Sequence, residues 1–105
     1  MFQWKGAPFM KLLVDIDLRA ADMAAFEAYE AAVLPLLAEH GAVLERRLRA
    51  VDDSAETHLI DVPSQAALDA YLADPRRAAL APAWRACGAV ASHREFKDLA
   101  LRPQS

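Results

Sequence analysis

Residues 42–62 read AVLERRLRAVDDSAETHLIDV, and this stretch decides the fold. The segments 42–51 and 56–62 have the length and the residue types of strands, and the sequence DDS at 52–54 is typical of a turn. Such a short connection joins neighbouring antiparallel strands. The stretch therefore predicts a β-hairpin in the middle of the chain.

A helix is predicted before this hairpin, from Asp22 to Gly41. Its apolar stripe at helical spacing consists of Phe26, Tyr29, Val33, Leu36 and Leu37. Asp22 is suited to cap the start of the helix, and Gly41 is suited to end it. Three acids lie off the stripe and are expected to face solvent, namely Glu27, Glu30 and Glu39. Pro35 is expected to kink this helix or to divide it in two.

A second helical region is predicted after the hairpin. Ser64 is its expected N-cap, the Asp-Pro pair at 74–75 breaks and restarts it, and Gly88 ends it. Strands are predicted at the two outer ends, over residues 9–18 and 90–99. One side of the first strand is wholly apolar, since it carries Met10, Leu12, Val14, Ile16 and Leu18. The other side of that strand is mixed.

The predicted element order is β-α-β-β-α-β, which indicates an α+β, ferredoxin-like fold. We expect a single domain over residues 9–101, with tails at 1–8 and 102–105. In this fold a four-stranded antiparallel sheet carries both helical regions on one face. The bare face has apolar residues, so we predict a homodimer in which two sheets pack together.

Composition excludes several classes of protein. The chain has 105 residues, a formal charge of −3 and a single cysteine, Cys87. No apolar run is long enough for a membrane span, and no multi-cysteine zinc site or internal disulfide can form. The acidic balance argues against nucleic-acid binding. The absence of a signal-peptide pattern predicts a cytoplasmic protein, and the richness in Ala and Arg indicates a bacterial source.

Two segments resemble a known family. Residues 29–48 (YEAAVLPLLAEHGAVLERRL) and 60–77 (IDVPSQAALDAYLADPRR) are similar to an uncharacterised family of the dimeric α/β-barrel superfamily. That family has a Tyr, a helical Pro and His-Gly-Gly before the second strand, an acidic-Phe-Pro-Ser turn, and a later Ser-Pro or Asp-Pro break. This chain departs from the pattern at Ala42, at Val62, and at 76–77, where two arginines replace a Tyr.

The resemblance implies a ferredoxin-like protomer that pairs sheet to sheet. Members of the superfamily include cofactor-free monooxygenases and lactone isomerases. One hypothesis is therefore a cofactor-independent enzyme, monooxygenase- or isomerase-like, that acts on a small aromatic or lactone-like metabolite. The alternative is a non-catalytic module for small-molecule binding or stress response, or an accessory subunit. The sequence leaves open whether the protein is an enzyme.

Two histidines are candidate catalytic residues. His58 lies in the middle of a predicted strand, and His93 lies on the last strand. An imidazole can donate or accept a proton near neutral pH. The simpler interpretation of His58 is a buried, hydrogen-bonded strand residue. The fold places the two histidines a strand apart and lacks a metal-ligand spacing, so we predict neither a metal nor a cofactor.

The candidate substrate-binding residues are mainly aromatic. Tyr29, Tyr71 and Trp84 are predicted to project from the helices towards the sheet, where they line a pocket or simply fill the core. Asp61 is expected on the sheet face opposite to His58, and it matches the acidic position of the family. The pair at 76–77 is expected to flank the pocket entrance, and Arg76 is the candidate contact.

The arginines of the second strand, Arg46, Arg47 and Arg49, alternate in direction, so at least one is expected to point inward or into a dimer contact. They would bind an anion or form salt bridges with acids such as Glu56. RNA binding is disfavoured because the central strands lack the aromatic stacking motif.

Overall fold

The computed structural model describes residues 10–99. Its centre is an antiparallel sheet with strand order β2-β3-β1-β4. The strands are β1 (Met10–Asp17), β2 (Val43–Arg49), β3 (Ala55–Val62) and β4 (Val90–Lys97). This order confirms the ferredoxin-like prediction. The predicted tails, including Phe2 and Trp4, lie outside the described residues.

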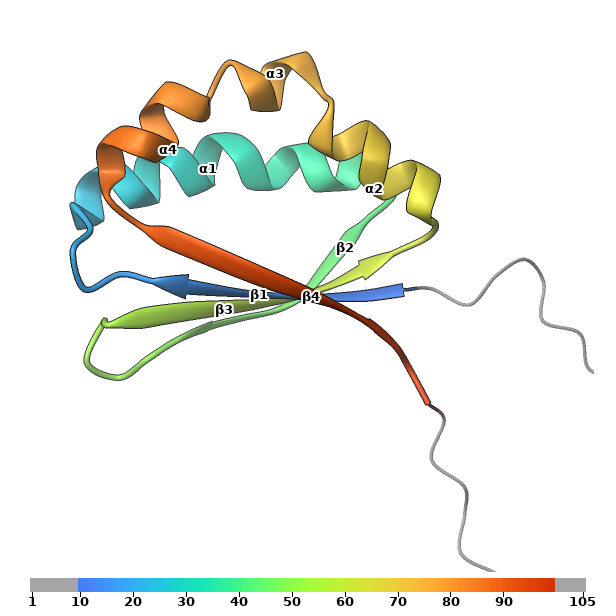
Figure 1. Ribbon diagram of the computed structural model, residues 1–105, viewed down its shortest axis with the longest axis horizontal. Coiled ribbons are helices and arrows are strands. Elements are labelled where there is room, and N and C mark those ends of the chain that lie inside the picture. Colours follow the sequence, from blue (N-terminus) through green and yellow to red (C-terminus); the bar gives the residue numbers. More distant parts are fainter. Residues whose placement is uncertain (1–9, 100–105) are drawn as a thin grey trace, which may run out of the picture.

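All helices lie on one face of the sheet (Figure 1). They are α1 (Met23–Glu39), α2 (Gln65–Leu72), α3 (Pro75–Ala78) and α4 (Ala81–Cys87). Figure 1 shows α1 along this face of the sheet, while α2, α3 and α4 form an arch on the same side. Within the described part of the chain, every helix is too short or too polar to span a lipid bilayer.

The predicted helix boundaries are confirmed by their caps. The side chain of Asp22 accepts a hydrogen bond from the Ala25 amide at 3.0 Å, and Ser64 accepts one from the Ala67 amide at 3.0 Å. Gly88 ends α4 with φ at +82°, and a Cβ there would lie 2.6 Å from the Ala20 carbonyl oxygen. Only glycine fits this turn without strain or a clash.

Two expectations about proline need correction. Pro35 was expected to kink the first helix or to divide it. A division is wrong, because α1 continues through this residue to Glu39, whereas the kink stays a prediction. Conversely, the restarted helix after Asp74 is not a single helix. It is divided into α3 and α4 near Leu80, and Pro82 lies in the first turn of α4, where its missing N–H costs nothing.

The core lies between the helices and one face of the sheet. It forms two clusters, one of Leu12, Leu37, Ala42, Ile60, Val62 and Leu68, and one of Ile16, Leu18, Phe26, Cys87 and Ala89. The apolar side of β1 thus faces the helices, as the alternation predicts. Phe26 is fully buried, so truncation to Ala would leave a cavity.

A β-bulge in β2 changes which residues face the helices. Leu44 pairs with Ile60, but the next pair is Arg46 with Leu59, so the register shifts by one residue at Glu45. Beyond the bulge, Arg47 pairs with His58 and Arg49 pairs with Glu56. Both arginines therefore lie on the covered face, where regular alternation would have placed Arg46 and Leu48.

Candidate active site

A cavity of about 200 Å³ lies between the sheet and the helices. Its floor is formed by inward residues of β1, β3 and β4, and its roof by α1 and the arch of α2 to α4. Aromatic side chains line much of it, namely Tyr29, Tyr71 and Trp84. The rings of Tyr29 and Trp84 are in contact, with centroids 5.0 Å apart. A planar apolar molecule matches such walls.

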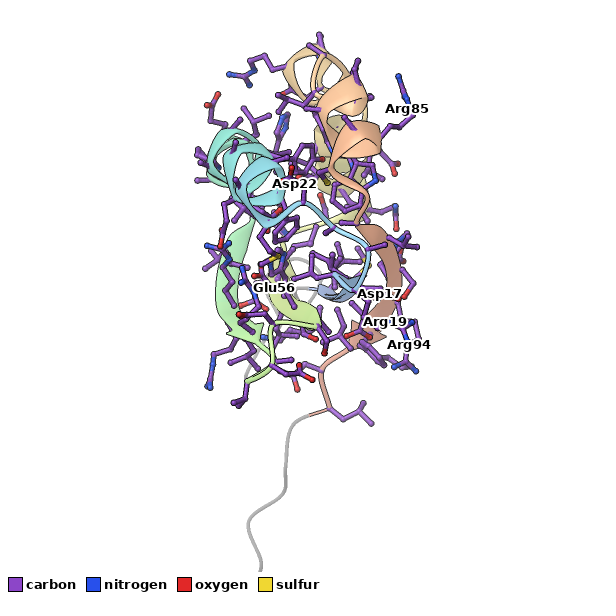
Figure 2. The ribbon with its side chains drawn as sticks, turned by 90° about the vertical axis from the view of Figure 1, so that its left-hand side faces the viewer. Asp17, Arg19, Asp22, Glu56, Arg85 and Arg94 are labelled. Carbon is purple, nitrogen blue, oxygen red and sulfur yellow. The ribbon has the colours of Figure 1, made fainter. Side chains whose placement is uncertain are left out.

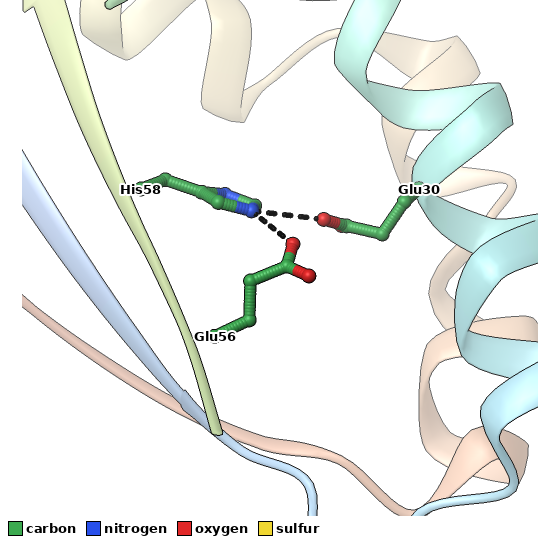
Figure 3. A group of neighbouring side chains, drawn as sticks. All are labelled: Glu30, Glu56 and His58. Carbon is green, nitrogen blue, oxygen red and sulfur yellow. Dashed lines mark hydrogen bonds and ion pairs between the residues drawn. The ribbon is translucent and has the colours of Figure 1, made fainter. Parts of the chain in front are cut away.

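The titratable wall of this cavity is a buried cluster of three residues (Figure 3). His58 projects from β3, and its Nε2 lies 2.5 Å from Oε2 of Glu56, two residues earlier on the same side of the strand. Glu30 reaches down from α1 and places its Oε1 3.1 Å from the same nitrogen. All three residues are at most 3% exposed.

Two carboxyl groups thus approach one ring nitrogen. Nε2 carries at most one hydrogen, and the geometry directs it to Glu56. Oε1 of Glu30 has no hydrogen-bond partner among the described residues, although it is buried. Its contact with His58 is therefore an ion pair without a directed hydrogen bond. Glu30 also lines the cavity, so its carboxyl group can contact a bound molecule.

Glu56 is held on its other side by the two inward arginines of β2. Nε of Arg47 lies 2.9 Å from Oε2 of Glu56, and Nε of Arg49 lies 2.7 Å from Oε1. Both guanidinium groups also reach the exposed carboxylate of Glu27 on α1, at 3.1 and 2.9 Å. The predicted salt bridges of these arginines are therefore present, and they tie β2 to α1. Figure 3 shows the carboxylate of Glu56 on the side of β3 that faces α1.

The charges of this network determine the protonation of its members. Burial raises the pKa of Glu56, but the hydrogen bonds from Arg47, His58 and Arg49 outweigh it and hold the pKa at about 2. Burial lowers the pKa of His58, but the carboxyl groups of Glu30 and Glu56 outweigh it, so the net pKa is raised. The arrangement therefore favours an imidazolium, which adds the third positive charge to a network of three carboxyl groups.

The cluster also has the spacing of a metal site, since one ligand atom from each of Glu30, Glu56 and His58 lies within 4.8 Å of the others. However, both oxygens of Glu56 already accept hydrogen bonds from arginine. A divalent ion here would lie against two guanidinium charges. The donor set therefore fits a proton on His58 better than a metal ion.

The free energy of unfolding is expected to depend on pH through this cluster. The contribution of His58 is fully present below its unfolded pKa of 6.5 and is lost as the pH rises through the raised folded value. The contribution of Glu56 is present above 4.5 and is lost as the pH falls towards 2. Urea denaturation between pH 4 and 9 should thus show a decline above pH 6.5. The H58Q variant should lack this decline, and an equal decline in H58Q would contradict the assignment.

The second candidate histidine, His93, lies on the same face of the sheet. Val14 pairs with His58 on one side and with His93 on the other. Strands are spaced about 4.8 Å apart, so the two histidines flank β1 at roughly 10 Å. Both line the cavity, but His93 is exposed. A ligand above Val14 would therefore have a histidine on each side.

The structure places Asp61 and Arg76 away from this cavity. Asp61 lies on the opposite face of the sheet, where it forms an ion pair with Lys11. Arg76 lies on the surface, with Nη2 2.8 Å from Asp74 and Nη1 2.7 Å from Glu39. Its neighbour Arg77, by contrast, lines the cavity.

Sequence reasoning missed Glu30. The expectation that Glu30 faces solvent is wrong, because its side chain is buried among the inward residues of α1. A signal was present in the sequence, since Glu30 lies four residues after Phe26 and three before Val33. Glu56 has the same parity on β3 as His58 and Ile60, which indicates the covered face.

Comparison with known proteins finds solved structures that share the fold of this chain. No family model and no curated protein sequence matches the chain. SnoaB, a cofactor-independent oxygenase from Streptomyces nogalater, is similar with a TM-score of 0.77 and 24% identity, over 93% of this chain and 100% of that chain. A protein of unknown function from Nitrosomonas europaea has a TM-score of 0.61 and 18% identity, over 92% and 95%.

A third solved structure is described as a dimeric ferredoxin-like protein of unknown function from Thermobifida fusca. Its TM-score is 0.52 at 13% identity, over 90% of this chain and 96% of that chain. At these identities the likeness concerns the fold, which carries many functions. The chain has the ferredoxin-like fold of these proteins, as the resemblance to the dimeric α/β-barrel superfamily predicts.

Proposed function

We propose that this protein is a cofactor-independent enzyme that binds a small aromatic or lactone-like molecule in the cavity and transfers a proton through His58. The observation that carries the proposal is a buried imidazole at the wall of an aromatic cavity, held by two carboxyl groups. Titratable groups with shifted pKa values in a cavity are typical of active sites. The fold shared with SnoaB, whose description is a cofactor-independent oxygenase, supports the same class.

The geometry of His58 suits acid–base catalysis. Its Nε2 side is occupied by Glu56 and Glu30, so Nδ1 is the nitrogen for a ligand. The bond to Glu56 fixes the ring orientation and stabilises the positive charge that forms when Nδ1 accepts a proton. Above the raised pKa of His58, the neutral imidazole removes a proton from an acidic O–H or C–H of the ligand, and the resulting imidazolium later returns it. This step is common to oxygenation of an aromatic anion and to isomerisation of a lactone.

His93 is the second candidate catalytic residue. It is exposed and lies across β1 from His58, so it reaches the ligand from the open side of the cavity. In this position it can exchange a proton with water after each turnover. Tyr29, Tyr71 and Trp84 form the walls that position the ring. Asp61 and Arg76 are not part of this proposed site.

The proposal is tested by blocking the cavity. Ala91 on β4 lines the cavity, and A91W would fill it with an indole ring. We expect turnover of a responsive substrate, found among hydroxylated aromatics and lactones without added cofactor, to fall at least about tenfold in A91W. Dioxygen consumption distinguishes oxygenation from isomerisation.

The matched control is A70W, which adds the same ring at an exposed position of α2. It should leave turnover unchanged. Equal turnover in A91W and the wild type would show that the chemistry does not use this cavity.

The alternative function is a non-catalytic binding or accessory module. The size of the cavity favours this alternative. Its volume of about 200 Å³ is smaller than the roughly 300–1,000 Å³ of most ligand pockets. In that case the ion-pair network of β2 and β3 would serve stability alone. Ligand binding without turnover, at every pH between 5 and 9, would support the alternative over the enzyme.

We also propose that the chain forms a homodimer through the bare face of the sheet. Figure 1 shows no helix on this face within the described residues. Its apolar side chains include Leu13 and Leu59, which are half-buried, and Phe96, which is 41% exposed. The similarity to a protein described as a dimeric ferredoxin-like protein supports this pairing. In a two-fold dimer, these apolar side chains of one protomer would pack against the same side chains of its partner.

The dimer is tested by placing a charge on this face. L59E puts two carboxylates into a two-fold interface, so we expect dimer dissociation to become at least about 100-fold more favourable. Sedimentation equilibrium at micromolar concentration measures the change. V51E, at the fully exposed turn between β2 and β3, is the control and should sediment as the wild type does. A wild-type mass of one chain would rule out the dimer.

A further inference from the structure

Arg77 is a cation at the cavity that has no carboxylate partner among residues 10–99. It lies on α3 and lines the cavity with Tyr71 and Trp84. Its Nε is buried and has no hydrogen-bond partner in the described part of the chain. Among residues 10–99 it also forms no ion pair within 4.0 Å, whereas Arg76 beside it binds two carboxylates. The two neighbouring arginines therefore have different environments.

A half-buried guanidinium without a counter-ion is unfavourable. Removing a charged donor from water without a hydrogen bond costs more than for a neutral group. The Tyr71 ring offsets part of this, since Cζ of Arg77 lies 5.2 Å from its centroid. A cation–π contact supplies roughly 0.5–2 kcal/mol but leaves the buried Nε without a hydrogen-bond partner among the described residues. An anionic oxygen in the cavity would satisfy this donor.

The charge of Arg77 acts on the walls of the same cavity. Burial raises the pKa of Tyr29 and of Tyr71. The positive charge of Arg77 opposes this rise at Tyr29, and side-chain hydrogen bonding to Arg77 together with its charge opposes it at Tyr71. The two tyrosines and the guanidinium therefore surround one space. An aromatic ring between these walls would present its substituents to Arg77.

We infer that the ligand of this cavity is an aromatic carboxylate whose carboxylate group binds Arg77. This inference rests on the proposed function, because it names the substrate class of the same cavity. A guanidinium binds a carboxylate with charge-assisted, often paired hydrogen bonds. The aromatic walls contribute affinity for the ring, while Arg77 selects for the charge.

The placement of the charges also orients the ligand. Arg77 lies in the roof at α3, whereas Glu30 and His58 form another part of the wall. Arg77 would attract a carboxylate, whereas at the other wall the charge of Glu30 offsets that of the His58 imidazolium. The ring would therefore present the part farthest from its carboxylate to His58, where the proposed proton transfer takes place.

The test uses 2-naphthoate and its uncharged amide of the same shape, 2-naphthamide. In a W4F background Trp84 is the sole tryptophan, so its indole N–H signal reports binding in an NMR titration. At pH 7 we expect 2-naphthoate to bind at least about tenfold more tightly than the amide. R77Q should weaken binding of the acid about 10–100-fold and change binding of the amide less than about threefold.

The matched control is R85Q, which removes the same charge from the outer side of α4, where Figure 2 shows Arg85 pointing away from the sheet. It should preserve the preference for the acid. Equal binding of acid and amide would overturn the inference while leaving the cavity as an aromatic site. Failure of both to bind at millimolar concentration would overturn the inference and the proposed ligand site together. If both R77Q and R85Q lose the preference for the acid over the amide, that preference is an effect of net charge, and the inference about Arg77 is overturned.

Discussion

Replacing Glu56 by glutamine is expected to lower the free energy of unfolding by about 3–5 kcal/mol. Glu56 is 1% exposed and accepts hydrogen bonds from Arg47, Arg49 and His58. The E56Q variant keeps the size of the side chain but removes the charge that compensates three cationic groups. Urea denaturation at pH 6, where His58 is protonated, measures the loss.

Glu27 provides the matched control, because it binds the same two arginines from the solvent side. Its carboxylate is half exposed, so the E27Q variant should lose no more than about 1 kcal/mol. Similar losses in E27Q and E56Q would show that burial does not strengthen this network. If E56Q lowers the free energy of unfolding by much less than about 3 kcal/mol, the arginines must find other partners.

Replacing His58 by glutamine is expected to lower turnover of a responsive substrate by about 10²–10⁴-fold. Glutamine keeps a hydrogen-bonding group near Glu56 but cannot exchange a proton near neutral pH. The KM should change little, because the aromatic walls remain. Steady-state kinetics of the folded protein, with circular dichroism as a check on folding, measure the effect.

Two further variants separate catalysis from structure. H40Q removes a histidine that lies 2.8 Å from Asp74, outside the cavity lining, and should leave turnover unchanged. E30Q leaves His58 and Glu56 in place but removes one of the two carboxyl groups that raise the pKa of His58. The pH profile of turnover should therefore move to lower pH in E30Q. An unshifted profile with full activity would exclude His58 as the titrating group.

The fold was largely predictable because its signals are local. Alternation in β1 and β3, the caps at Asp22 and Ser64, and the turn at 52–54 each depend on neighbouring residues. The strand order then follows from the ferredoxin-like connection. The continuity of α1 through Pro35 was not predictable locally, since packing of the helix on the sheet supports it despite the lost hydrogen bond.

The candidate site was predictable only in part. The parity of β3 separates His58 from Asp61, as expected, and helical spacing brings Tyr29 and Trp84 to the same cavity. The partners of His58 depend on tertiary packing of α1 over β3, so local charge patterns misassigned Glu30 to solvent. The choice between Arg76 and Arg77 likewise depends on which direction the short α3 turns after Asp74.

The extra residue at Glu45 has a consequence for comparing this chain with distant homologues. It offsets the inside-outside parity of β2 between Leu44 and Arg47. A homologue without the insertion would carry its equivalent guanidinium groups one step out of phase, so column-by-column alignment would report them as lost. Conservation of the ion pairs between Glu56 and the arginines of β2 should therefore be judged by the side of the sheet on which each residue lies, and not by its position in the chain.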